Sequence, residues 1–187
     1  MKKIFIIHGF NGYPNGGWRP WLMSELRKKD VYACALPMPS PDKPTVDKWV
    51  KTISMAVESP NRNIFLVGHS LGVNAILRYL ETLPVGDKIG GAILVSGPYE
   101  NLKDEEHKVL APFFETPFDF DHIKKTCSKF VIIHSTDDPV VSFNNAILMA
   151  NKLSCEIVSL SKGGHFNGSS GIYKFPELLE TLEKIIV

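Results

Sequence analysis

Short runs of apolar residues alternate along the chain with longer stretches in which apolar residues recur at helical spacing. The short runs are continuous rather than interrupted by polar residues, which is typical of parallel strands covered on both faces. Strands that alternate with helices predict βαβ units and a parallel sheet. We expect strands at 4–7, 31–36, 63–67, 92–95, 130–134 and 156–160, and helices at 18–29, 45–57, 71–83, 142–153 and 175–186.

The composition is that of an ordinary globular chain. Its 187 residues are 44% hydrophobic and 22% charged with a net charge of +1, so we expect one domain over 1–187 and no nucleic-acid or membrane partner. Cys34, Cys127 and Cys155 are odd in number and widely spaced, which predicts reduced thiols rather than a disulfide framework. The apolar run at 4–7 is too short for a signal peptide. We therefore expect a cytoplasmic protein.

The sharpest motif is Gly68-His69-Ser70-Leu71-Gly72, which matches G-x-S-x-G. It follows a predicted strand and opens a predicted helix, the setting that a nucleophile elbow requires. Such a turn lifts the hydroxyl of Ser70 to the carboxyl edge of the sheet, and the helix start leaves the Leu71 amide free. The motif predicts that Ser70 is a nucleophile. The alternative is a tight turn whose glycines serve only close packing.

A serine nucleophile needs a base and an acid that orients the base, and in this setting both come later in the chain. His165 lies in a glycine-rich loop after the last predicted strand and is the candidate base. Asp137 and Asp138 are adjacent after the fifth strand. Asp138 is favoured because a proline and two valines follow it in a loop that turns inward. Asp137 is then expected to cap the turn.

An oxyanion formed at Ser70 needs two backbone donors. One is the Leu71 amide, and the other is expected from the loop at 8–12, where Phe10 is the first candidate and Asn11 a weaker one. The chain has no zincin spacing, P-loop or G-x-G-x-x-G motif, so we expect neither a metal nor a cofactor.

One segment, 97–128, is long for a crossover between two strands and holds four phenylalanines. It predicts either ordinary packing with a short helix from Asp121, or an apolar wall that leans over the active site. Both alternatives stay open at this point.

Taken in order along the chain, these motifs resemble the YdeN-like small serine hydrolases, the group that includes the retinoblastoma-binding-protein-type hydrolases. The residues that carry the resemblance are 6–9, 18–22, 68–72, 93–97, 135–139 and 163–166. It implies a minimal α/β-hydrolase fold without a large lid, and it supports Ser70, Asp138 and His165 as a catalytic triad. Some relatives have a proline where this chain has Ser142.

The expected fold is a six-stranded parallel sheet of order 2-1-3-4-5-6 with helices on both faces. A ligand would bind at the carboxyl ends of the strands where the order reverses. The expected activity is hydrolysis of small carboxylic esters, or amides, through an acyl-enzyme. The rival hypothesis is a degenerate hydrolase fold that binds a protein partner without turnover. An acyltransferase or peptidase would use the same triad.

Overall fold

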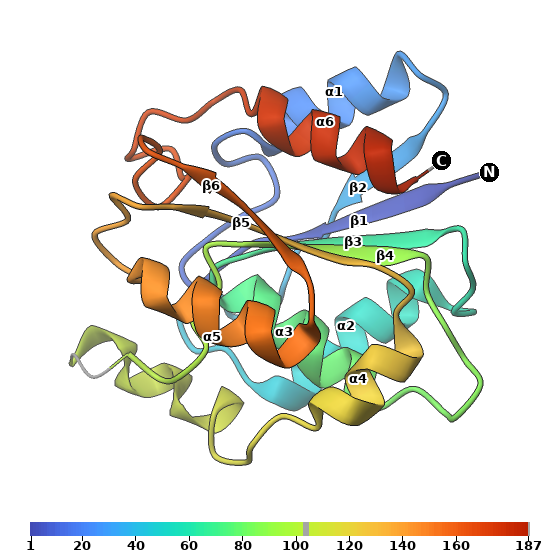
Figure 1. Cartoon of the computed structure of the whole chain (residues 1–187), viewed down its shortest axis with the longest axis horizontal. Coiled ribbons are helices and arrows are strands. Elements are labelled where there is room, and N and C mark those ends of the chain that lie inside the picture. Colours follow the sequence, from blue (N-terminus) through green and yellow to red (C-terminus); the bar gives the residue numbers. More distant parts are fainter. Residues whose placement is uncertain (103–104, 187) are drawn as a thin grey trace.

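The computed structural model describes residues 1–102 and 105–186, and its centre is a six-stranded sheet (Figure 1). All the strand pairings are parallel and the order is β2-β1-β3-β4-β5-β6, which confirms the predicted topology. The strands are β1 (Lys3–Ile7), β2 (Tyr32–Ala35), β3 (Ile64–His69), β4 (Gly91–Val95), β5 (Phe130–Ser135) and β6 (Glu156–Leu160).

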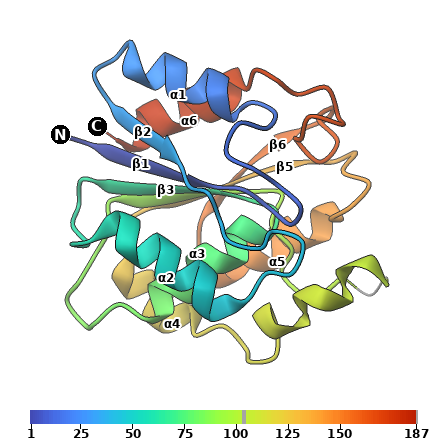
Figure 2. The same ribbon diagram turned by 180° about the vertical axis from the view of Figure 1, so that it is seen from behind.

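Helices cover both faces of this sheet (Figures 1 and 2). One face carries α1 (Arg19–Arg27) and α6 (Pro176–Ile185), which contact each other. The opposite face carries α2 (Val46–Val57), α3 (Leu71–Glu81), α4 (Phe120–Thr126) and α5 (Phe143–Leu153). No helix in the described part of the chain is long and apolar enough to cross a membrane.

Two hydrophobic cores result, one on each face of the sheet. In β1, Ile4 and Ile6 pack in the core beneath α1 and α6, whereas Phe5 and Ile7 pack in the core beneath α2 and α3. Successive side chains of a strand point to opposite faces, so a strand between two cores needs an apolar residue at every position. This requirement explains the continuous apolar runs, and the observed element ends lie within two residues of the predicted ones.

The segment 97–128 packs along α3, and its residue His107 also reaches the loop after β1, where the rings of His107 and Phe10 lie 5.8 Å apart. It forms a 3₁₀ helix, η1 (Glu106–Phe113), and then α4; residues 103 and 104 lie outside the described residues. The buried Arg78 of α3 donates two hydrogen bonds of 3.1 and 2.9 Å to the Phe113 carbonyl. Phe113 packs edge-on against Trp49 in the core. Of the described residues in this segment only Glu106 lines the cavity beside Ser70. Phe113 is a core residue, whereas Phe114, Phe118 and Phe120 are partly buried and line a separate cavity beside Tyr99, so none of the four phenylalanines forms a wall of the Ser70 cavity.

Candidate active site

Ser70 stands between β3 and α3 in the backbone conformation of a sharp elbow. Its φ is 55° and its ψ is −125°, a region that non-glycine residues rarely adopt. Its amide donates to the Val95 carbonyl at 2.9 Å. Two residues on, a Cβ at Gly72 would lie 2.3 Å from the Ile7 carbonyl oxygen. Only glycine lets the first turn of α3 approach β1 so closely, and this approach sets where Ser70 emerges.

The loop after β1 lies against the serine. A Cβ at Gly9 would lie 2.8 Å from the Ser70 Cβ and 3.3 Å from its hydroxyl oxygen, so no side chain fits between this loop and the serine. The Asn11 amide donates to the Pro41 carbonyl at 2.9 Å and is occupied. The amides of Phe10 and Leu71 have no hydrogen-bond acceptor among the described residues. Of the two predicted loop donors, the structure therefore leaves Phe10 available and not Asn11.

His8 holds this loop in place. The Gly9 carbonyl accepts a hydrogen bond of 2.8 Å from Nδ1 of His8, so that nitrogen carries the proton. The other ring nitrogen, Nε2, then accepts from the Met38 amide at 3.3 Å. Burial lowers the pKa of His8, which favours this neutral form. His8 thereby ties the Phe10 loop to the proline-rich loop after β2.

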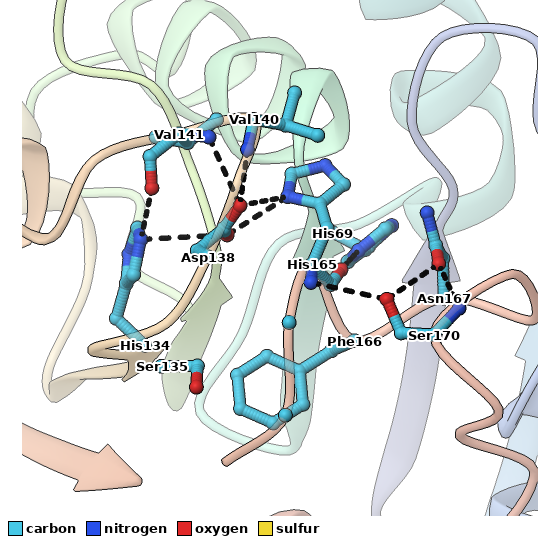
Figure 3. A network of polar contacts seen from close by, with 12 residues as sticks. His69, His134, Ser135, Asp138, Val140, Val141, His165, Phe166, Asn167 and Ser170 are labelled. Atoms are coloured by element: carbon cyan, nitrogen blue, oxygen red, sulfur yellow. Dashed lines mark hydrogen bonds and ion pairs between the residues drawn. The ribbon is translucent and has the colours of Figure 1, made fainter. Parts of the chain in front are cut away.

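Asp138 and His165 are in contact at the carboxyl edge of the sheet (Figure 3). The His165 Nδ1 atom lies 2.9 Å from Oδ2 and 3.2 Å from Oδ1 of Asp138, whose side chain is fully buried. The Asp138 Oδ1 atom also accepts from the amides of Val140 and Val141 at 2.9 and 3.0 Å. Burial acts to raise the pKa of Asp138, but the hydrogen bond and charge of His165 and these two amides outweigh it, and the net pKa is lowered.

The neighbouring Asp137 has a different partner. Its Oδ1 atom accepts hydrogen bonds from the amides of Gly163 and Gly164 at 3.1 and 2.9 Å, and from the hydroxyl of Ser135. The Ser135 hydroxyl and then the Gly164 amide keep the pKa of Asp137 low. The expectation that Asp137 caps the turn is therefore wrong, because Asp138 accepts from the turn amides of Val140 and Val141. Asp137 instead fastens the loop that carries His165 to the end of β5.

Three further contacts hold the His165 loop. Nε2 of the buried His69 donates to the His165 carbonyl at 2.7 Å (Figure 3). The Trp18 indole donates to the Phe166 carbonyl at 2.8 Å, and the Phe166 ring stacks on Phe175 with 4.6 Å between ring centroids. Burial, reinforced by the charge of His165, lowers the pKa of His69 to about 3, so His69 stays neutral. These contacts anchor the loop in the core beneath α1 and α6.

A second histidine reaches Asp138, and the sequence did not single it out. His134 of β5 is fully buried; its Nε2 donates to the Val141 carbonyl at 2.8 Å and lies 3.5 Å from Asp138 Oδ2 (Figure 3). Its Nδ1 has no hydrogen-bond partner in the described structure. Burial lowers the pKa of His134 and keeps the ring neutral. His134 looks like any inward residue of a strand, so only its spatial neighbours distinguish it.

Ser70 and His165 open into one cavity of about 650 Å³. The cavity lies where the strand order reverses, between the ends of β1 and β3, as the topology predicts. Within the described structure no hydrogen bond joins the Ser70 hydroxyl to His165, so a shared cavity is what brings these two residues together. Its wall also includes Phe10, Asn11, Tyr13, Arg19, Glu106 and Tyr173.

A doubly covered parallel sheet of this order, with a strained serine elbow at its carboxyl edge, defines an enzyme of the α/β-hydrolase class. The family model described as "Serine hydrolase" matches residues 4–184, and the chain belongs to that family.

Known relatives match over nearly the whole length. The protein YdeN of Bacillus subtilis (strain 168) is 34% identical over 181 residues, covering 97% of this chain and 94% of the relative. Serine hydrolase RBBP9 of Rattus norvegicus is 26% identical over 187 residues, covering 98% and 95%. The crystal structure of the ydeN gene product from B. subtilis superposes with a TM-score of 0.94 at 33% identity, covering 99% of this chain and 98% of that one.

Proposed function

We propose that this serine hydrolase cleaves small carboxylic esters, with amides as a second class, through a triad of Ser70, His165 and Asp138. The observation that carries the proposal is the hydrogen bond between His165 Nδ1 and the buried Asp138 carboxylate, made by a loop that opens into the cavity of Ser70. Because Nδ1 donates to Asp138, Nε2 of His165 keeps a free lone pair and can accept a proton.

The reaction proceeds in two halves. His165 Nε2 takes the hydroxyl proton as Ser70 Oγ attacks the carbonyl carbon, and Asp138 stabilises the imidazolium that forms. The free amides of Leu71 and Phe10 bind the oxyanion. The bond to the alcohol then breaks, and the proton of His165 passes to the leaving oxygen. Water attacks the acyl-enzyme in the same way and releases the carboxylic acid.

The predicted substrates are small molecules with short acyl groups. In the described structure no large insertion covers the cavity, and polar side chains make up much of its wall. A long acyl chain would find little apolar surface to bury there. The rival hypothesis is a protein-binding module without turnover. No observation on the described residues favours it over the enzyme. A cytoplasmic location stays a prediction, supported by three free cysteines.

Labelling with a fluorophosphonate probe tests the nucleophile. The wild-type enzyme is expected to label, while Ser70→Ala should not label and His165→Ala should label far more slowly, because the probe reports an activated serine. Far-UV circular dichroism checks that each variant is folded. A folded wild type that does not react would overturn the enzyme mechanism and favour the binding module.

Kinetics with 4-nitrophenyl acetate separate the two aspartates. Asp138→Asn is expected to lower kcat by about 10³- to 10⁴-fold, since the amide no longer orients and stabilises the imidazolium. Asp137→Asn keeps an oxygen that can accept from Gly163 and Gly164, so its loss should stay below about tenfold. Equal losses in the two variants would contradict the assignment of Asp138 as the acid.

A further inference from the structure

The cavity of Ser70 contains a buried positive charge that the triad mechanism does not use. Arg19, the first residue of α1, lines this cavity and is only 6% exposed. Its Nε donates to the Tyr13 carbonyl at 3.1 Å, and its guanidinium carbon lies 5.6 Å from the centre of the Trp18 ring. These contacts hold the side chain in the cavity wall.

Arg19 has no counter-ion in the described structure. None of the ion pairs there includes it, and its Nη1 and Nη2 atoms make no hydrogen bond. Both atoms keep some solvent-accessible surface, and the residue lines the cavity. A buried cation without a partner is costly, and an anionic ligand would remove that cost.

The surrounding groups do not neutralise this charge. Glu106 also lines the cavity, but it is exposed and forms no ion pair with Arg19. His69 and His8 face Arg19 as neutral rings, and the charge of Arg19 contributes to their lowered pKa values. Burial lowers the pKa of Arg19 to about 10, which still leaves it charged at neutral pH. The cavity beside Ser70 is therefore locally positive.

The backbone makes room for the guanidinium. A Cβ at Gly16 would lie 2.5 Å from Arg19 Nη2, so any larger residue would push the guanidinium out of its place. The loop before α1 is thus shaped around a charged side chain that has no structural ion pair.

We propose that Arg19 binds a carboxylate on the substrate, so that the preferred substrates are esters carrying a negative charge away from the scissile bond. This inference rests on the proposed ester hydrolysis and specifies which class of esters the enzyme prefers. A guanidinium presents two parallel N–H donors that match the two oxygens of a carboxylate. One free cation fits the single charge of a carboxylate better than the double charge of a phosphate monoester.

Matched esters test the proposal. One pair is mono-(4-nitrophenyl) adipate and its methyl ester, which place the charge on the acyl side; the other is 4-acetoxybenzoate and its methyl ester, which place it on the alcohol side. The measured quantity is the ratio of kcat/KM for the acid to kcat/KM for its methyl ester. For at least one pair, this ratio is expected to be about ten or higher in the wild type and to fall at high salt. In Arg19→Gln this ratio should fall by about tenfold or more.

Two further variants keep the test decisive. Arg27→Gln removes an exposed arginine from the last turn of the same helix and should leave the ratio unchanged. Arg19→Lys keeps the charge but loses the two parallel N–H donors, so its ratio should lie between those of wild type and Arg19→Gln. A wild type without preference in either pair, or a ratio that Arg19→Gln does not change, would overturn the proposal.

A binding measurement separates this proposal from the proposed function. Monomethyl adipate is titrated by calorimetry into Ser70→Ala and into Ser70→Ala/Arg19→Gln, neither of which turns it over. Binding about tenfold weaker in the double variant supports the anion site even if the wild type hydrolyses no ester. Ester hydrolysis without Arg19-dependent binding or preference would retain the hydrolase and reject the anion site.

Discussion

At the scale of single residues, three buried histidines surround the predicted triad without belonging to it. His8 fixes the Phe10 loop, His69 fixes the His165 loop, and His134 lies beside Asp138. Burial lowers the pKa of each of them and holds each ring neutral. Each ring binds a backbone carbonyl through one N–H, so the neutral form is the one that supports the site.

This arrangement predicts a loss of stability in weak acid. The folded pKa of His69 is about 3, below the value of 6.5 of an unperturbed histidine, so unfolding takes up a proton between these two values. The contribution of His69 to the free energy of unfolding is fully present above about pH 6.5 and is lost as the pH falls toward 3, by about 1.4 kcal/mol per pH unit.

Urea unfolding of wild type and His69→Gln between about pH 7.5 and 4.5 measures this effect. Glutamine can still donate to the His165 carbonyl but does not titrate, so the stability of the variant is expected to depend less steeply on pH. The two proteins share all their other titratable groups, so the difference between their slopes reports His69. Identical slopes in the two proteins would contradict the lowered pKa of His69.

At the scale of elements, the elbow depends on how closely α3 approaches β1. Besides the 2.3 Å approach to Ile7, a Cβ at Gly72 would lie 2.8 Å from the His8 carbonyl oxygen. Backbone atoms cannot move aside as a flexible side chain can, so a larger residue must push the helix away from the strand. That movement would shift the Leu71 amide and Ser70 together.

Gly72→Ala is therefore expected to lower the free energy of unfolding by about 1–3 kcal/mol or more and to reduce ester hydrolysis as well. The control is Gly168→Ala, whose Cβ would meet nothing nearer than 3.6 Å and should leave stability within about 0.5 kcal/mol. Urea midpoints measure both variants. Equal midpoints would show that the elbow tolerates a Cβ at this position.

At the scale of the whole molecule, the two cores share one sheet. Trp18 lies in the core beneath α1 and α6, and Trp49 in the core beneath α2 and α3. The strands between them contribute alternate side chains to each, so neither core can unfold while the sheet stays intact. We predict that residues 1–187 unfold as a single cooperative domain.

Two double variants test this prediction. Trp21→Phe/Trp49→Phe leaves Trp18 as the only tryptophan, and Trp18→Phe/Trp21→Phe leaves Trp49. In each variant the urea midpoint from tryptophan fluorescence is expected to coincide with the midpoint from far-UV circular dichroism. Comparing the two probes within one variant corrects for any change in its stability. A fluorescence transition that precedes the loss of secondary structure would show that one core unfolds separately.

The sequence by itself determined the strands, most of the helices and the serine elbow, whereas the order of the strands in the sheet was predicted together with the resemblance to a known family. The strands and the elbow are local features: a continuous apolar run reports a strand covered on both faces, and glycines on either side of Ser70 report a tight turn. The strand–helix alternation then leaves few topologies, since parallel crossovers have one hand. The same reasoning selected Asp138 over Asp137 from the residues that follow it, and the structure brings Asp138 into contact with His165.

Only the tertiary structure decided which groups meet across the chain. Phe10 rather than Asn11 keeps a free amide because the distant Pro41 carbonyl takes the Asn11 amide. Asp137 reaches the His165 loop, and Arg19 turns into the cavity of Ser70, because the folded chain brings β1, β5 and α1 to one edge. Periodicity reports burial on an element's own face but carries no signal for a partner a hundred residues away, so such contacts become visible only once the chain is folded.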